Sequence, residues 1–374
     1  MIPSGNNIEH ALSDARGRPN GFDYLRIILS ISVVIWHTMV TSYGPEAQDA
    51  AQASAWRPLI TVILPMFFAL SGFLVAGSLH RCETVISFLG LRVIRIYPAL
   101  MAEVLLSAFI IGPLFTSFSL TDYYTSPVLH SYMWNLIGHV HFQLPGLFLQ
   151  NPNPNQVNGQ LWTIPWELYC YVTLGGMTVL GFARRRWLQV CASIALAIVL
   201  LAAFLYTKGF DFSQRMTAMP AFMLVLCFLA GVSLFQWRER IPYSKALFVT
   251  SAAIGLAGMS VPVYGDFIAI LPLTYCTVYL GVSTFRKTPV LALADYSYGI
   301  FLYGYVVQQA WMSVDLAFHH WAINLALALP TTLLLAIASW HLIEKPAMKF
   351  LRPIVVSIEE RFSQRPIRTA QAKP

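Results

Sequence analysis

The feature that most constrains the fold is the recurrence of apolar runs of about twenty residues along the whole 374-residue chain. An α-helix of this length spans the hydrocarbon core of a bilayer, and it pairs its own backbone polar groups where no water can do so. Only 11% of the residues are charged, whereas soluble domains carry about 25%. The sequence therefore predicts an all-α integral membrane protein that crosses a membrane several times.

The apolar runs predict a ten-helix transmembrane bundle with cytoplasmic N- and C-termini. The predicted spans are approximately 22–43, 58–79, 90–115, 161–182, 186–206, 217–236, 244–261, 265–284, 293–313 and 321–343. With the N-terminus in the cytoplasm, 21 of the 24 Lys and Arg residues fall in cytoplasmic segments, as the positive-inside rule requires. The net charge of +7 then reflects membrane topology, and we expect no nucleic-acid partner.

Three parts of the chain are distinguished by composition. Residues 1–20 and 351–374 are polar, and we expect them to be disordered cytoplasmic tails around one domain of residues 21–350. A long loop of residues 116–160 contains no Lys or Arg and is expected outside the cytoplasm. Its moderately apolar stretch, residues 128–150, is predicted to be a membrane-surface or re-entrant helix, because an eleventh span would reverse every later segment. A loop of this length is often functional.

The first predicted span carries two ionisable side chains, Arg26 near its start and His37 deep inside. They are eleven residues apart, so they lie on nearly the same helix face, about 16 Å apart along the axis. Ionisable groups in a membrane span are costly and are usually functional. Histidine is a good general base because its pKa lies near working pH. The alternative is a histidine that is buried and hydrogen-bonded for structural reasons.

Arg92 and Arg95 are neighbours on one helix face at the cytoplasmic start of the third span. Arginine binds phosphate bidentately, so the pair predicts a phosphate clamp. Ordinary positive-inside anchoring explains most such pairs. Together with Arg26 on the same membrane side, however, the two arginines outline a cationic mouth.

Three further residues are candidates for contact with a substrate. Glu167 lies in the fourth span, where it could orient His37, bind a sugar hydroxyl or pair with Arg57 or Arg215. Trp162 fits an interfacial aromatic belt, and aromatic rings also stack on sugars. Ser71 precedes Gly72, and the pair favours close helix packing; a nucleophilic serine is the less favoured reading, since there is no G-x-S-x-G elbow.

The sequence gives little indication of a metal site. His130, His139 and His141 include an H-x-H pattern, but no acidic or cysteine ligand lies near them in the sequence. The five cysteines show no C-x-x-C spacing. We therefore expect no metal.

Taken together, the motifs resemble those of the acyltransferase 3 family of integral-membrane acyltransferases, over about residues 20 to 350. The resemblance rests on FDYLR with His37 eleven residues after Arg26, FFALSGFL, the R-x-x-R of Arg92 and Arg95, NGQLWTIPWELYCY, DYSYGIFLY and HLIEKP, in this order. It implies a ten-helix bundle that uses cytoplasmic acetyl-CoA or another acyl-CoA as donor. It also implies that Arg26 and His37 are essential and that Arg92 and Arg95 lie on the donor side.

The family resemblance implies an O-acetyltransferase, of the type without an added esterase-like domain, that acylates a carbohydrate or glycolipid such as O-antigen or exopolysaccharide. We expect His37 to be the general base, Arg26, Arg92 and Arg95 to bind the donor, and Trp162, Glu167 and Ser71 to contact substrate. Glu167 is also a candidate catalytic residue. An alternative from another class is a proton-coupled transporter or lipid-linked sugar flippase that uses Arg26, His37 and Glu167. A structural subunit without activity would leave these buried charges unexplained.

Overall fold

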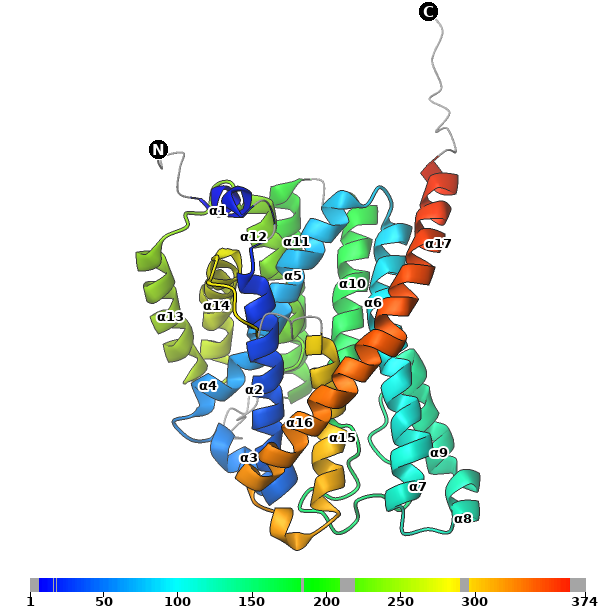
Figure 1. Ribbon diagram of the computed structural model, residues 1–374. Helices are drawn as coiled ribbons and strands as arrows, with labels where there is room; N and C mark the ends of the chain where they lie inside the picture. Colours follow the sequence, from blue (N-terminus) through cyan, green and yellow to red (C-terminus); the bar gives the residue numbers. More distant parts are fainter. Residues whose placement is uncertain are drawn as a thin grey trace, which may run out of the picture.

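The computed structural model describes residues 7–363 except residues 16, 18, 183–184, 209–218 and 290–295. Over these residues the chain is helical, and its β-structure is limited to two isolated bridges. Figure 1 shows a bundle in which the first and last described residues lie at the same end. The helices are α1 (Ile8–Asp14), α2 (Gly21–Tyr43), α3 (Pro45–Gln52), α4 (Arg57–Thr61), α5 (Ile63–Arg81), α6 (Val85–Leu106), α7 (Gly112–Phe115), α8 (Leu120–Thr125), α9 (Pro127–Tyr132), α10 (Ile164–Val179), α11 (Arg186–Lys208), α12 (Met223–Trp237), α13 (Lys245–Met259), α14 (Tyr264–Val282), α15 (Ser297–Met312), α16 (Trp321–Ser339) and α17 (Lys345–Ser363).

Six helical stretches in the described part of the chain are long and apolar enough to cross a membrane. They are Gly21–Tyr43, Arg57–Arg81, Val85–Phe115, Arg186–Tyr206, Tyr264–Val282 and Trp321–Glu359. The other four predicted spans correspond to the shorter helices α10, α12, α13 and α15. The prediction of an all-helical membrane protein with several spans is confirmed. The count of ten crossings stays a prediction.

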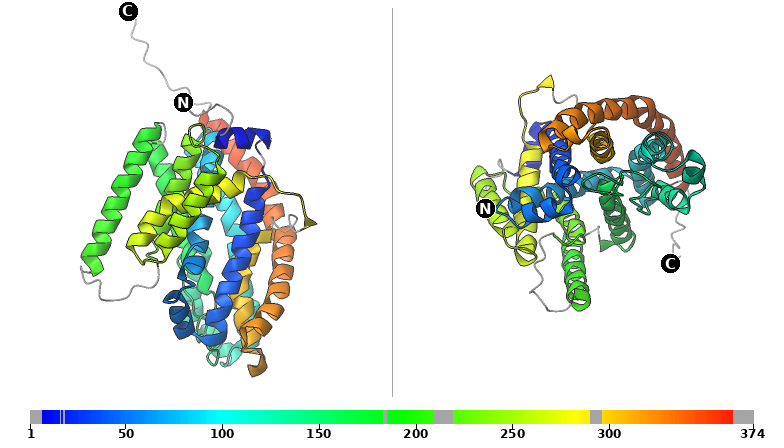
Figure 2. Two further views of the ribbon diagram at one scale, coloured as in Figure 1. Left: turned by 90° about the vertical axis from the view of Figure 1, so that its left-hand side faces the viewer. Right: turned by 90° about the horizontal axis from the view of Figure 1, so that it is seen from below.

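Helices α5 and α12 pack backbone to backbone near the centre of the bundle. A Cβ atom on Gly72 would lie 1.9 Å from the carbonyl oxygen of Phe228, and one on Gly231 would lie 2.2 Å from that of Ala69. Only glycine permits this approach. The packing role predicted for Gly72 is thereby confirmed. Figure 2 shows α11 (green) at one edge of the bundle and α16 and α17 (orange to red) curving along another.

Helices occupy parts of both terminal segments that the sequence led us to expect as disordered. Ile8 on α1 is fully buried, its N–H donates to the Ile241 carbonyl at 3.1 Å, and Glu9 pairs with Arg238. At the other end α17 continues α16 through a π-helical turn, η7 (Trp340–Glu344), and packs along α6. The polar composition of these segments did not indicate α1 and α17, because each helix packs against residues that are distant in the sequence. Residues 1–6 and 364–374 of the two tails lie outside the described residues.

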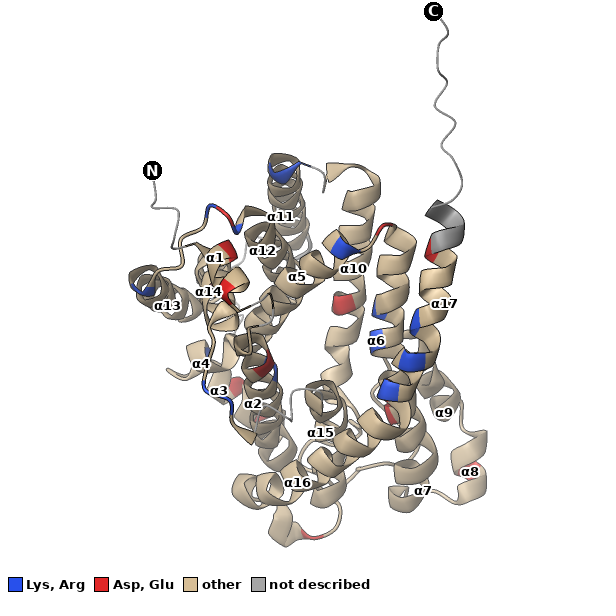
Figure 3. Ribbon diagram, turned by 45° about the horizontal axis from the view of Figure 1, so that its top comes forward, with Lys and Arg blue, Asp and Glu red and all other residues tan. Residues whose placement is uncertain are grey.

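The 116–160 segment consists of short helices and coil. It contains α8, α9 and the 3₁₀ turns η2 (Met133–Ile137) and η3 (Gly159–Thr163), and none of these is long enough to cross a bilayer. The structure therefore has no eleventh long helix here. Figure 3 shows Lys and Arg on α6, α11, α13 and α17, whereas α8 carries none.

Arg57 forms a buried ion pair that the sequence reading did not anticipate. Its guanidinium donates two parallel hydrogen bonds to the Asp266 carboxylate, at 2.9 and 2.8 Å, and a third to the Met259 carbonyl. The side chains are 4% and 0% exposed. Arg57 is thus the partner of Asp266 and not of Glu167. Arg215, the other suggested partner of Glu167, lies outside the described residues. The pair ties α4 to the α13–α14 hairpin.

Candidate active site

Two neighbouring cavities lie within the bundle. The first, here called the arginine cavity, is lined by Arg26, Arg92, Arg95 and Glu167 together with apolar side chains of α5 and α15, and has a volume of about 170 Å³. The second, here called the histidine cavity, contains His37 and has a volume of about 270 Å³. The structure therefore separates the predicted site residues into two groups.

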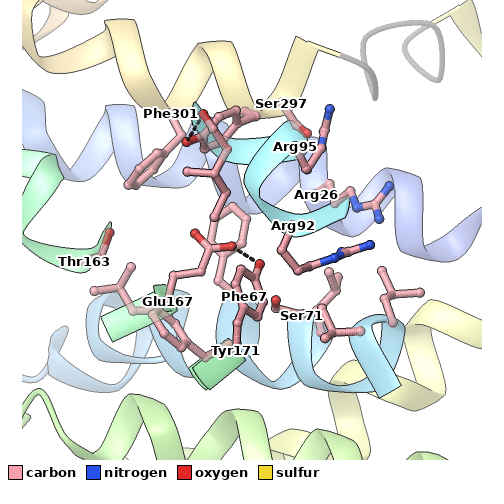
Figure 4. A pocket seen from close by; sticks show the side chains of 17 residues that line it. Arg26, Phe67, Ser71, Arg92, Arg95, Thr163, Glu167, Tyr171, Ser297 and Phe301 are labelled. Atoms are coloured by element: carbon pink, nitrogen blue, oxygen red, sulfur yellow. Dashed lines mark hydrogen bonds between the residues drawn. The ribbon is translucent and has the colours of Figure 1, made fainter. Parts of the chain in front are cut away.

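The cationic side chains of the arginine cavity come from two helices, α2 and α6. The Arg26 guanidinium lies 3.2 Å from the Asp23 carboxylate and that of Arg95 lies 3.5 Å from Glu344, but both arginine side chains keep about a third of their surface exposed, 37% and 33%. Arg92 donates to the Ser78 hydroxyl at 3.0 Å. Figure 4 shows the three side chains together at one end of the cavity. The three arginines predicted to form one cationic mouth are thus brought together.

Glu167 lies in the arginine cavity and does not line the histidine cavity. Its carboxylate accepts a hydrogen bond from the phenol of Tyr171, one turn further along α10. Ser71, on α5, lines the same cavity. Figure 4 shows the Glu167 and Tyr171 side chains meeting between Thr163 and the arginines. Of the roles suggested for Glu167, orienting His37 does not fit this placement, because Glu167 and His37 line different cavities.

The histidine cavity holds His37 among aromatic and amide side chains. Its lining includes Trp162, Gln156, Gln160 and Tyr305. The His37 ring packs edge-on against the Tyr305 ring, with centroids 5.0 Å apart. Among the described residues, no side chain forms a hydrogen bond with the imidazole. The ring nitrogens therefore remain available to a molecule in the cavity, as a general base requires.

The two cavities meet at a common wall, to which three side chains of the described residues contribute. Leu64 on α5, Thr163 at the end of η3 and Phe301 on α15 line both cavities. Figure 4 shows Thr163 and Phe301 at the end of the arginine cavity opposite the arginines. A molecule held by the arginines and another beside His37 would thus approach each other at this wall.

The loop before α10 is fixed to α15 by amide hydrogen bonds. Asn153 donates to the Tyr305 hydroxyl at 2.5 Å, and that hydroxyl donates to Gln156 at 3.2 Å. Gln309 donates to the carbonyl oxygens of Asn153 and Gln156, at 2.7 Å each. This network holds Tyr305 against His37.

Sequence reasoning missed Tyr305, Gln156, Thr163 and Phe301 as site residues. The available signal was the pair Gln308 and Gln309 inside an apolar run, since buried amides need partners. Gln308 donates to the Val34 carbonyl at 2.8 Å and to the Thr38 hydroxyl at 2.8 Å, so it fixes the part of α2 that carries His37.

The histidines on the loop form a close pair without further ligands. His139 Nδ1 and His141 Nε2 are 2.9 Å apart. Within the described ranges, no group of three or more His, Cys, Asp or Glu side chains is placed to hold a metal ion. This pair therefore gives no support to a metal centre.

The chain matches a family model described as an acyltransferase domain over residues 20–341. It is 26% identical to a protein named O-acetyl transferase from Shigella phage Sf6, over 88% of this chain and 96% of the relative. It is also 26% identical to Nodulation protein 10 of Rhizobium leguminosarum bv. viciae, over 91% of this chain and 96% of the relative. No solved structure matches the chain significantly. Because the family model covers most of the chain, this protein belongs to the acyltransferase 3 family and is an acyltransferase.

Proposed function

We propose that the protein transfers an acetyl group from cytoplasmic acetyl-CoA to a hydroxyl of a cell-envelope or secreted carbohydrate. The observation that carries the proposal is the pair of cavities, one with three arginines and the other with His37, that share one wall. The name of the phage relative, O-acetyl transferase, supports the acetyl group and the oxygen acceptor. A carbohydrate acceptor is consistent with the glutamine and tryptophan side chains around His37.

The arginine cavity fits the donor. Coenzyme A carries phosphate groups at one end and a thioester at the end of a long, flexible arm. Guanidinium groups of Arg26, Arg92 and Arg95 would bind the phosphates by charge-assisted hydrogen bonds. The apolar side chains that line the rest of the cavity, among them Phe67 and Val75, suit the arm. The thioester would then face the wall.

His37 acts as the general base in the proposed reaction. Its imidazole takes the proton of the acceptor hydroxyl while the oxygen attacks the thioester carbonyl carbon. A carbon–oxygen bond forms, the carbon–sulfur bond breaks, and the thiolate leaves. The proton held by His37 passes to the thiolate, so the products are the ester and CoA as its thiol. Tyr305, in edge contact with His37, keeps the imidazole in place.

The proposed topology puts the arginines on the cytoplasmic side of the inner membrane. The bundle would cross the membrane ten times with both termini in the cytoplasm, where acetyl-CoA is available. The positive-inside distribution of Lys and Arg supports this orientation. His37 would then receive the acceptor from the opposite side, past α3 and the 116–160 segment, since Gln48 and Gln156 line its cavity.

Donor binding tests the proposal without knowledge of the acceptor. Purified protein in detergent is titrated with acetyl-CoA, CoA and the phosphate-free thioester S-acetyl-N-acetylcysteamine, and the thermal midpoint is followed. We expect stabilisation by the first two compounds, with little effect of the third. The stabilisation by acetyl-CoA and CoA should be lost in an Arg92→Ala, Arg95→Ala variant. Folded protein that responds to neither CoA compound would contradict the proposed donor.

A further inference from the structure

We propose that the wall between the two cavities selects the length of the transferred acyl chain, through the side chains of Phe301 and Leu64. This inference rests on the proposed function and assigns a specificity determinant within it. Phe301, Leu64 and Thr163 are the residues that line both cavities.

The position of the wall follows from what the reaction requires. The thioester carbon of the donor must lie close to the acceptor hydroxyl beside His37 while the donor phosphates stay bound to the arginines. The donor enters from the arginine cavity and the acceptor from the histidine cavity. The carbonyl carbon must therefore lie at the boundary, and the acyl chain attached to it must lie among the side chains of the wall.

The composition of the wall favours a short chain. The Phe301 phenyl ring and the Leu64 isobutyl group line both cavities and pack against the hydrophobic core. Thr163 is only 6% exposed and is held by its hydrogen bond to the Gln160 carbonyl at 3.2 Å. Phe301 also contacts the Phe67 ring edge-on, with centroids 6.4 Å apart. Packed side chains yield little to extra methylene groups. An acetyl group adds one methyl at this point, whereas longer chains need space that Phe301 and Leu64 occupy.

The matched pair Leu64 and Leu74 gives a clean test. Both are leucines on α5, but Leu74 lines only the arginine cavity. The experiment measures dissociation constants of acetyl-, butyryl- and hexanoyl-CoA for the wild type, Phe301→Ala, Leu64→Ala and Leu74→Ala in detergent, with free CoA as reference. The quantity compared is the ratio of the butyryl-CoA constant to the acetyl-CoA constant.

We expect the wild type to bind butyryl-CoA about tenfold more weakly than acetyl-CoA, or worse, because a fitted pocket discriminates by at least this factor. Phe301→Ala and Leu64→Ala should each bring the ratio close to one, while Leu74→Ala keeps the wild-type ratio. The two wall variants lie on different helices, so failure of one to fold leaves the other. A wild type that binds both donors equally, or wall variants with the wild-type ratio, would overturn the proposal. Absence of binding by CoA and acetyl-CoA alike would instead count against the proposed function.

Discussion

The His37 imidazole packs edge-on against the phenol ring of Tyr305, with centroids 5.0 Å apart and planes at 78°. The two residues come from α2 and α15 and are 268 positions apart in the sequence. The Tyr305 hydroxyl is held in turn by Asn153 and Gln156. The orientation of the proposed base is therefore set by a loop and a helix that lie far from it in the sequence.

Removing the Tyr305 hydroxyl should impair catalysis more than donor binding. Tyr305→Phe keeps the ring against His37 but leaves Asn153 and Gln156 without that partner. A hydrogen bond of this kind contributes about 1 kcal/mol, which corresponds to roughly a fivefold loss in kcat. Steady-state kinetics with acetyl-CoA should show the lower kcat, with KM for the donor unchanged. Tyr305→Ala should lose more activity, and equal kcat in both variants would argue against a positioning role.

Replacing His37 by Ala should abolish acyl transfer. General-base catalysis contributes about 100- to 10,000-fold to a rate. The thermal midpoint of the variant and its stabilisation by acetyl-CoA should stay close to those of the wild type, since the arginine cavity does not include His37. Transfer is followed by release of the CoA thiol in the presence of an acceptor. Normal turnover in this variant would remove His37 from the mechanism.

Replacing Arg92 by Ala should weaken the use of donor specifically. A charge-assisted hydrogen bond contributes about 1.5–3 kcal/mol, so KM for acetyl-CoA should rise about 10- to 100-fold while KM for the acceptor changes little. Arg81→Ala is the matched control, because Arg81 ends α5 and does not line the cavity. An equal rise of both KM values in Arg92→Ala would speak against a donor clamp.

Breaking the Arg57–Asp266 pair should destabilise the protein. Asp266→Ala leaves a guanidinium that is 4% exposed without its carboxylate, and the loss of one partner of a buried pair costs about 3–5 kcal/mol. The double variant Arg57→Leu, Asp266→Leu should recover much of this loss, because no buried charge remains. Thermal unfolding in detergent compares the variants. A double variant less stable than Asp266→Ala would show that the pair contributes more than charge compensation.

A side chain at Gly72 should prevent α5 and α12 from packing. Even the Cβ atom of Gly72→Val would lie 1.9 Å from the Phe228 carbonyl oxygen. The variant should give little folded protein in size-exclusion chromatography. Gly176→Val is the control, because a Cβ atom on Gly176 meets nothing within 4 Å. Wild-type yield of folded Gly72→Val would mean that the two helices can separate without loss of the fold.

Features that depend on local chemistry could be predicted from the amino-acid sequence. Apolar runs predict helices because each backbone must pair its polar groups internally in lipid. The helical repeat of α2 placed Arg26 and His37 on one face, and that of α6 placed Arg92 beside Arg95. The motifs identified the family, which the family model confirmed.

Which of these side chains share a cavity became known from the packing of the helices. Glu167 belongs with the arginines, Trp162 with His37, and Thr163 stands between them. These assignments depend on how η3 packs against α15 and how α10 packs against α6 and α12. The residue pattern within α10 does not reveal which helices lie beside it. The Arg57–Asp266 pair and the Tyr305–His37 contact were not predicted for the same reason. A contact between residues more than 200 positions apart is fixed by the packing of whole helices, and the local sequence does not encode that packing in a form that can be read directly.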